Sequence, residues 1–201
     1  MANIITLIRI PLLFIFISLL NSGKSLIIFW CIPFIIFIML LDMVDGLVAR
    51  YLNETSLLGS ALDIAVDRAL EIILWVVFSC HGLIPILIPL IVITRGTLTD
   101  AVRCVGTCNG ETAFDQLKNP INRFLVSSRF MRDFYGFIKG AAFAVLTLDL
   151  GFQSFENIWS DKIHLFALYL AWFTIVITIV RGIPVIVEEV GVLKNPEPDK
   201  I

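Results

Sequence analysis

The sequence predicts an all-α membrane protein, a bundle of six transmembrane helices around a polar cavity that opens to the cytoplasmic face. Three observations predict this fold. Hydrophobic residues make up 58% and charged residues 16% of the 201 positions, and soluble domains usually carry ~25% charged residues. Six apolar stretches approach the ~20 residues that a spanning helix needs. Lysine and arginine concentrate between alternate stretches, which indicates a fixed orientation in the membrane.

The predicted spans are joined by short connections, except for one polar segment at 107–133. Their ranges are 4–20, 26–51, 57–80, 83–105, 134–152 and 163–187. The first span resembles a signal peptide in length, but Arg9 and Pro11 interrupt its apolar run and no small-residue cleavage site follows. We therefore expect a helix of the mature protein, a single membrane domain over 1–190, and a short tail at 191–201.

The basic residues predict the orientation. With both termini inside, only Lys24 and Lys162 of the 15 lysine and arginine residues lie on the outer side. Short loops rich in lysine and arginine stay in the cytoplasm. The sequence therefore predicts a multi-pass protein of the bacterial inner membrane, with its polar cavity on the cytoplasmic side.

The polar segment contains a further predicted helix. Asn119 is suited to cap its start and Pro120 to occupy its first position. Apolar side chains then share one face, which is typical of an amphipathic helix at the membrane interface. Its contribution to a binding site is open at this point.

Other residue types give no sign of a second kind of site. The net charge of -2 does not favour nucleic acid as a partner. The four cysteines lie mostly in apolar surroundings without a CxxC pair, so they are expected to pack in the core. His81 and His164 are far apart in the sequence and have no ligand spacing.

Four aspartates lie where a membrane helix should be apolar. Asp42 and Asp45 form an i, i+3 pair, and Asp63 and Asp67 form an i, i+4 pair, so each pair shares one helical face. An ionisable residue at the centre of a membrane helix costs roughly 2.5 to 3.5 kcal/mol on insertion scales. The short connection between the two spans makes them antiparallel neighbours, and the four carboxylates are expected to converge.

Converging carboxylates repel one another unless a cation joins them. Mg²⁺ and Mn²⁺ prefer oxygen ligands and commonly share them with substrate phosphates. Gly46 and Gly59 leave room for a ligand or for the opposite backbone. Arg50 lies about one turn beyond Gly46, where a fixed cation can hold a phosphate. The hairpin therefore predicts a divalent-metal site for a phosphorylated ligand.

Read as one string, these residues give the pattern D-x2-D-G-x2-A-R-x8-G-x3-D-x3-D. It resembles the signature of the CDP-alcohol phosphatidyltransferase family. The fixed positions that match are Asp42, Asp45, Gly46, Ala49, Arg50, Gly59, Asp63 and Asp67. The first residues are similar to the N-x-x-T-x-x-R that opens many members, through Asn3, Thr6 and Arg9. The six-span layout extends the resemblance over nearly the whole chain.

The resemblance implies an enzyme of phospholipid biosynthesis. Such enzymes transfer a phosphatidyl group from CDP-diacylglycerol to the hydroxyl of a small polar alcohol and release CMP. The resemblance also implies two Mg²⁺ or Mn²⁺ ions, a homodimer within the membrane lipid, and Asp67 as the catalytic base. The implied metal ligands are Asp42, Asp45, Asp63 and Asp67. The implied CDP-binding residues are Thr6, Asp42, Gly46, Ala49, Arg50 and Gly59.

Basic residues outside the signature indicate the acceptor alcohol. The acceptor-binding candidates are Arg68, Arg95, Arg103 and Lys139. They favour a phosphorylated alcohol over serine or choline, because a phosphate pairs well with fixed cations. Glycerol 3-phosphate is the first expectation because it is a prevalent acceptor in the family. An arginine directly after the last signature aspartate is more like the branch that uses inositol or inositol phosphate, so that acceptor remains open.

Simpler interpretations of these basic residues also remain open. Arg68 is spaced to pair with Glu71 at i, i+3. Arg95 and Arg103 are spaced either to pair with Asp100 or to extend toward the membrane surface.

Two further classes of membrane protein use intramembrane aspartates. An ion pathway lines them up to conduct protons or cations, and aromatic prenyltransferases use aspartate-rich metal sites. Neither class explains Gly46, Arg50 and Gly59 at their spacings.

Overall fold

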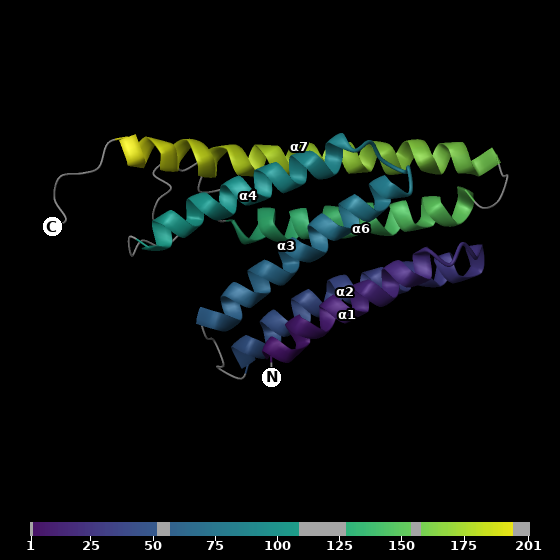
Figure 1. The fold of residues 1–201 in the computed structure, drawn as a ribbon, viewed down its shortest axis with the longest axis horizontal. Helices are drawn as coiled ribbons and strands as arrows, with labels where there is room; N and C mark the ends of the chain where they lie inside the picture. The colour runs from purple at the N-terminus through teal and green to yellow at the C-terminus, as the bar shows by residue number, and fades with distance from the viewer. Residues whose placement is uncertain (1, 52–56, 109–127, 154–157, 195–201) are drawn as a thin grey trace. The chain divides into compact units, whose positions relative to one another are not determined.

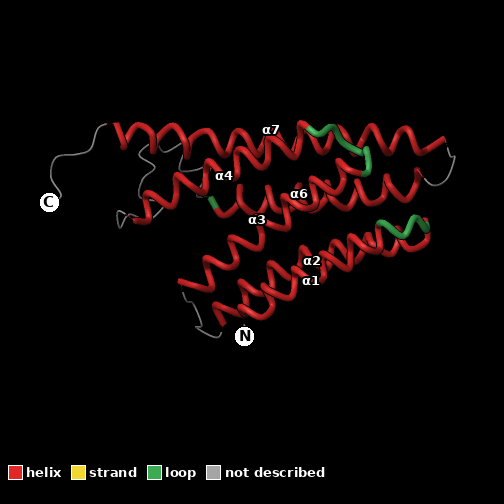
Figure 2. The backbone as a smooth tube through the Cα atoms, viewed as in Figure 1, coloured by secondary structure: helices red, strands yellow, loops and turns green. Residues whose placement is uncertain are grey.

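The computed structural model describes residues 2–51, 57–108, 128–153 and 158–194 (Figure 1). These residues form six α-helices, and no strand occurs among them (Figure 2). The helices are α1 (Ala2–Leu20), α2 (Ser25–Tyr51), α3 (Leu57–Cys80), α4 (Leu87–Cys108), α6 (Arg129–Gln153) and α7 (Ile158–Lys194). Each predicted span overlaps one helix, so the predicted all-α class is confirmed.

Two stretches within the described helices are long and apolar enough to cross a membrane. They are Asp133–Gln153 in α6 and Trp159–Pro184 in α7. Ile5–Leu20 and Ser25–Leu41 are shorter apolar stretches in α1 and α2. The number of spans and the face on which the cavity opens stay predictions.

The start of the fourth predicted span was wrong, because α4 begins at Leu87 and not at residue 83. Gly82 has a φ of 75°, in the left-handed region, which a glycine adopts without steric cost. The N–H of Leu83 bonds to the carbonyl of Phe78 at 3.1 Å, as in a Schellman cap. Leu83 therefore belongs to the cap of α3, although its apolar side chain continues the pattern of α4.

The last two helices extend beyond their predicted ranges of 134–152 and 163–187. An apolar pattern marks the part of a helix that suits hydrocarbon, whereas backbone hydrogen bonds continue into polar residues. Arg129 and Arg132, at the end of the polar segment 107–133, lie in the first turn of α6. The predicted start of that helix, Asn119 and Pro120, lies outside the described residues.

The chain divides into two compact units, each built from two segments. The first comprises Met1–Pro89 and Lys139–Ala171, and the second comprises Leu90–Ile138 and Trp172–Ile201. In the first unit, α1 packs against both α2 and α3. The helices that carry the two aspartate pairs therefore share one neighbour. The single membrane domain expected over 1–190 stays a prediction.

Aromatic side chains join α6 to α3 within the first unit. The ring of Phe143 lies 4.9 Å from that of Trp75 and 6.0 Å from that of Phe78, measured between centroids. All three side chains are fully buried. Near the other end of the unit, the ring of Phe29 lies 5.4 Å from that of Phe152. The contacts of Phe143 fix the position of α6 along α3, and the contact of Phe152 joins α6 to α2.

Two threonine hydroxyls in the second unit are satisfied within α4. The hydroxyl of Thr97 bonds to the carbonyl of Ile93 at 2.9 Å, and that of Thr99 bonds to the carbonyl of Arg95 at 2.9 Å. Back-bonding of this kind satisfies a hydroxyl without a ligand or water. These α4 threonines are therefore compatible with a membrane helix and need no binding role.

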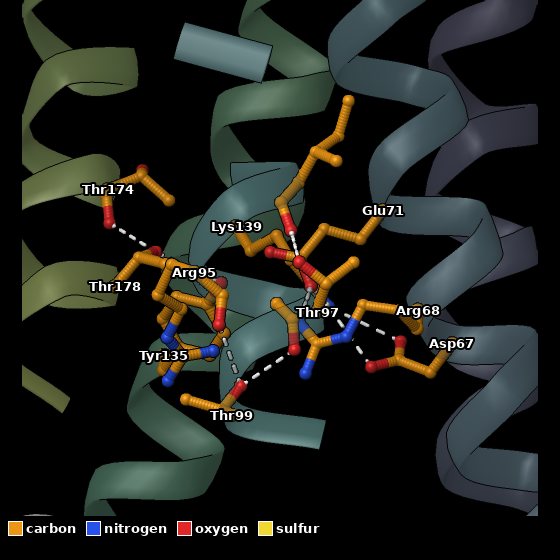
Figure 3. A network of polar contacts seen from close by, with 12 residues as sticks. Asp67, Arg68, Glu71, Arg95, Thr97, Thr99, Tyr135, Lys139, Thr174 and Thr178 are labelled. Carbon is orange, nitrogen blue, oxygen red and sulfur yellow. Dashed lines mark hydrogen bonds and ion pairs between the residues drawn. The ribbon is translucent and has the colours of Figure 1, made fainter. Parts of the chain in front are cut away.

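Tyr135 joins α6 to α7 within the same unit. The hydroxyl of Thr178 donates to the Tyr135 hydroxyl at 3.1 Å (Figure 3), and the Arg181 guanidinium lies 5.0 Å from the centre of the tyrosine ring. Gly182 follows Arg181 and is buried against the side chain of Arg95. A Cβ at Gly182 would lie 2.5 Å from Arg95 Nε. Glycine is thus required there for the observed path of Arg95.

We expect Gly182→Ala to destabilise the protein by about 1 to 3 kcal/mol, because the added methyl group overlaps the Arg95 side chain. Gly136→Ala is the matched control, since Gly136 is exposed on α6 and a Cβ there meets nothing within 4 Å. The control should be neutral or stabilising by up to about 1 kcal/mol, because alanine is the better helix former. Thermal unfolding in detergent measures both, and equal shifts would contradict the packing assignment.

Candidate functional site

The polar site of the first unit is built around two aspartates on α3. Asp63 and Asp67 are one turn apart, and their side chains are 47% and 40% exposed. Arg9 on α1 approaches them with its guanidinium. Nη1 of Arg9 lies 3.9 Å from Asp63 Oδ1, and Nη2 lies 3.9 Å from Asp67 Oδ1. A single cation therefore bridges two carboxylates from a different helix.

Lys139 on α6 reaches the same group of carboxylates (Figure 3). Its Nζ donates to Asp67 Oδ1 at 3.3 Å and lies 3.4 Å from Oδ2. The same Nζ lies 3.6 Å from Glu71 Oε2. Glu71 is buried one turn beyond Asp67, and Arg68 Nη1 lies 3.5 Å from its Oε2. The α3 face thus continues from Asp63 and Asp67 to Glu71, with a cation beside each carboxylate.

The aromatic contacts between α3 and α6 explain this placement of Lys139. Phe143 lies one turn after Lys139 on α6, and Trp75 lies one turn after Glu71 on α3. Residues four apart on a helix project from the same face. Packing Phe143 against Trp75 in a T-shaped contact therefore brings Lys139 beside Glu71, one turn earlier on both helices. Apolar packing holds the ion pair in register.

The structure brings together two of the four predicted metal ligands. Asp63 and Asp67 meet around Arg9, whereas Asp42 and Asp45 lie on the last part of α2 with side chains outside the described ones. The side chains of Ala49 and Arg50 and the surroundings of Gly46 lie outside the described part as well. Among the described side chains, no three Asp, Glu, His or Cys residues gather closely enough to hold a metal ion. The carboxylate oxygens of Asp63 and Asp67 suit Mg²⁺ or Mn²⁺ as hard donors.

Two predicted CDP-binding residues lie within the described first unit. Thr6 is buried on α1, one turn before Arg9. Gly59 is half-buried in the first turn of α3, one turn before Asp63. Thr6 therefore lies one turn from Arg9, which bridges the carboxylates, and Gly59 lies one turn from Asp63.

The acceptor-binding candidates differ in what the structure shows. Lys139 contacts Asp67 and Glu71, and Arg68 pairs with Glu71 as its spacing allowed. Arg95 lies against Gly182 in the second unit. The side chain of Arg103 is outside the described ones, although its backbone is part of α4.

Two residues of the cluster had no assigned role in the sequence-based site. Arg9 was noted only as part of the opening motif, and Glu71 only as a partner for Arg68. Both carried a signal, because each is an ionisable residue within an apolar helix. Glu71 also extends the i, i+4 series of Asp63 and Asp67 by one further turn.

We expect Lys139→Met to destabilise the protein by about 3 to 5 kcal/mol, because it removes one partner of a buried ion pair and leaves Glu71 under-compensated. Glu71→Gln in the same chain should recover part of this loss, since it removes the buried charge. Thermal unfolding of the wild type, both single variants and the double variant measures the coupling. Strictly additive effects would show that Lys139 and Glu71 do not interact.

Sequence comparison decides the family. A profile of the CDP-alcohol phosphatidyltransferase family matches residues 1–193. The chain belongs to this family. The family is membrane-bound, so the predicted membrane class is confirmed. Its members are transferases.

Curated relatives match over a shorter segment. Proteins of Mycobacterium bovis and Mycobacterium tuberculosis named "Putative cardiolipin synthase" are each 33% identical to this chain over 98 residues. The match covers 48% of this chain and 45% of each relative. The chain thus aligns with less than half the length of these relatives.

Proposed function

We propose that the protein transfers a phosphatidyl group from CDP-diacylglycerol to the hydroxyl of a polar alcohol and releases CMP, as a step of phospholipid synthesis. The observation that carries this proposal is the pair Asp63 and Asp67, which share one face of α3 and are bridged by Arg9. In a chain that matches this family over residues 1–193, such a pair is suited to metal-assisted phosphoryl transfer.

The proposed reaction is a substitution at phosphorus. The acceptor oxygen attacks the phosphorus of the phosphatidyl group, and the bond from this phosphorus to the bridging oxygen of the pyrophosphate breaks. CMP leaves with the bonding electron pair. Asp67 takes the proton of the acceptor hydroxyl as general base, and its side chain is exposed enough to be reached, at 40%.

The metal ligands proposed are Asp42, Asp45, Asp63 and Asp67. One or two Mg²⁺ or Mn²⁺ ions bound there would neutralise the pyrophosphate and stabilise the leaving CMP. Thr6, Gly46, Ala49, Arg50 and Gly59 are proposed to line the CDP pocket. Lys139 positions the Asp67 carboxylate through its contacts of 3.3 and 3.4 Å.

Glycerol 3-phosphate is the proposed acceptor. Arg68 and Lys139 lie next to Asp67 and carry the charge that a phosphate needs, and Arg95 and Arg103 remain further candidates from the sequence. Inositol or inositol phosphate is the alternative within the same chemistry, and serine follows it. The name of the mycobacterial relatives favours a second candidate, phosphatidylglycerol, because cardiolipin contains two phosphatidyl groups on one glycerol.

A homodimer, a multi-pass topology with the site on the cytoplasmic face, and residence in a bacterial inner membrane complete the proposal. These features rest on the family resemblance and on the distribution of basic residues. They are independent of which alcohol accepts the phosphatidyl group.

Purified protein with CDP-diacylglycerol and Mn²⁺ should release CMP when glycerol 3-phosphate is added. Inositol, inositol phosphate, serine and phosphatidylglycerol are tested in parallel, and the lipid product is identified by mass spectrometry. Fastest release with phosphatidylglycerol would replace the proposed acceptor and keep the reaction. Absence of CMP release with every acceptor, combined with cation flux in liposomes without nucleotide, would favour an ion pathway.

We expect a chelator to abolish CMP release and added Mg²⁺ or Mn²⁺ to restore it. Asp42→Asn, Asp45→Asn and Asp63→Asn should each raise the metal concentration needed for half-maximal activity, because an amide is a neutral and weaker ligand for a hard cation. Full turnover in excess chelator would contradict a metal-dependent reaction.

Asp67→Asn separates chemistry from binding. Loss of a general base should lower the rate by roughly 10² to 10⁴, while CDP-lipid affinity should fall less than in Asp42→Asn. Titration with CDP-lipid and CMP release at saturating acceptor measure the two effects. Near-normal turnover in Asp67→Asn would remove the base assignment, and equal losses of affinity in both variants would make Asp67 chiefly a metal ligand.

A further inference from the structure

Arg9 is a fully buried charge, with 0% of its surface exposed. It lies within α1, whose next turn carries the buried side chain of Leu13. A guanidinium cannot lose its proton in a protein, and burying an ion costs several kcal/mol unless it is compensated. The position of Arg9 therefore depends on the negative groups that it faces.

Arg9 faces the carboxylates of Asp63 and Asp67, both at 3.9 Å. This distance is within ion-pair range but longer than a normal N–H···O hydrogen bond of 2.7 to 3.2 Å. The guanidinium thus spans the two carboxylates from the buried side. The aspartate side chains remain 47% and 40% exposed, so a second cation can approach them from the open side.

We propose that Arg9 is the built-in counter-cation of the metal site, a positioning residue that holds Asp63 and Asp67 together and lowers their affinity for the metal. This inference rests on the proposed function, because it takes the two aspartates as metal ligands. Without Arg9, Asp67 would keep its contact with Lys139, but the two carboxylates would lose the cation that bridges them. With Arg9, the pair is assembled before the metal arrives.

Lys139 has different partners from Arg9, which supports a counter-cation role for Arg9 in particular. Its ammonium contacts Asp67 and also Glu71, so it keeps a negative partner if a metal takes Asp67. Arg9 bridges two aspartates that are both proposed metal ligands. Its charge therefore stays close to any ion bound there, and Coulomb repulsion between them weakens metal binding.

The test measures Mn²⁺ binding to the purified protein without any nucleotide. The electron paramagnetic resonance signal of free Mn²⁺ reports how much of the ion is bound. Arg9→Gln removes the charge and keeps a polar side chain, and its dissociation constant for Mn²⁺ should fall by about 10-fold or more. Arg9→Lys keeps the charge and should stay within about 3-fold of the wild type. A weaker or unchanged affinity in Arg9→Gln would overturn the proposal.

Asp63→Asn distinguishes failure of this inference from failure of the metal assignment. If Asp63→Asn leaves Mn²⁺ binding unchanged, Asp63 is not a metal ligand, and both the metal assignment and the role of Arg9 are wrong. If Asp63→Asn weakens Mn²⁺ binding while Arg9→Gln does not strengthen it, only the role of Arg9 is wrong. Unchanged Mn²⁺ affinity together with weaker CDP-lipid binding in Arg9→Gln would make Arg9 a substrate contact and overturn the counter-cation role.

Arg9→Gln removes the cation that bridges Asp63 and Asp67, and this variant is at risk of not folding. The double variant Arg9→Gln/Asp63→Asn removes one positive and one negative charge, and it is compared with Asp63→Asn alone. The double variant should bind Mn²⁺ more tightly than Asp63→Asn, and equal or weaker binding would overturn the proposal. In thermal unfolding, Mn²⁺ should stabilise Arg9→Gln more than it stabilises the wild type, because tighter binding to the folded state raises stability.

Discussion

Compensation of charge along one face of α3 is the constraint on which the site of the first unit depends. Asp63, Asp67 and Glu71 follow one another at intervals of one turn, and cations from three helices lie beside them. These cations are Arg9 on α1, Arg68 on α3 and Lys139 on α6. Low-dielectric surroundings make each unpaired charge costly, so the three helices have to meet where the charges meet. The proposed phosphatidyl transfer would use the same charges.

The apolar packing and the polar cluster support one another. Contact between Phe143 and Trp75 sets the position of α6 along α3, and one turn earlier this position brings Lys139 to Glu71 and Asp67. A rigid partner of this kind is what a general base needs, because small displacements of a catalytic group reduce the rate substantially. We propose that Arg9 likewise positions Asp63 and Asp67 from α1, where it is buried in the core of the unit.

Much of the fold followed from the sequence, because each apolar run is long and turn residues separate the runs. The range of α3, 57–80, was predicted correctly at both ends. The start of α4 was not, since Leu83 is apolar and yet caps α3 through its N–H. Hydropathy reports where a side chain prefers to be, whereas a helix end is set by backbone hydrogen bonds. The same difference explains why α6 and α7 extend beyond their apolar parts.

The aspartate signature was likewise visible in the sequence because its spacing is fixed within one hairpin. The roles of Arg9 and Glu71 were not, because they depend on which helices pack together. Asp63 and Arg9 are 54 positions apart in the sequence, and no local pattern predicts that they meet. The residues that bind the acceptor are less predictable still, since Arg68 and Lys139 are engaged with Glu71 and a phosphate would have to share them.

The position of the bound metal ion tests the proposed site most directly. Crystals grown with Mn²⁺ and a CDP-lipid, measured at the manganese absorption edge, locate the ion by anomalous scattering. The account predicts an anomalous peak about 2.0 to 2.6 Å from carboxylate oxygens of Asp63 and Asp67, with Arg9 on the opposite, buried side of both. A manganese peak bound elsewhere, with Asp63 and Asp67 contacting only Arg9 and Lys139, would contradict it.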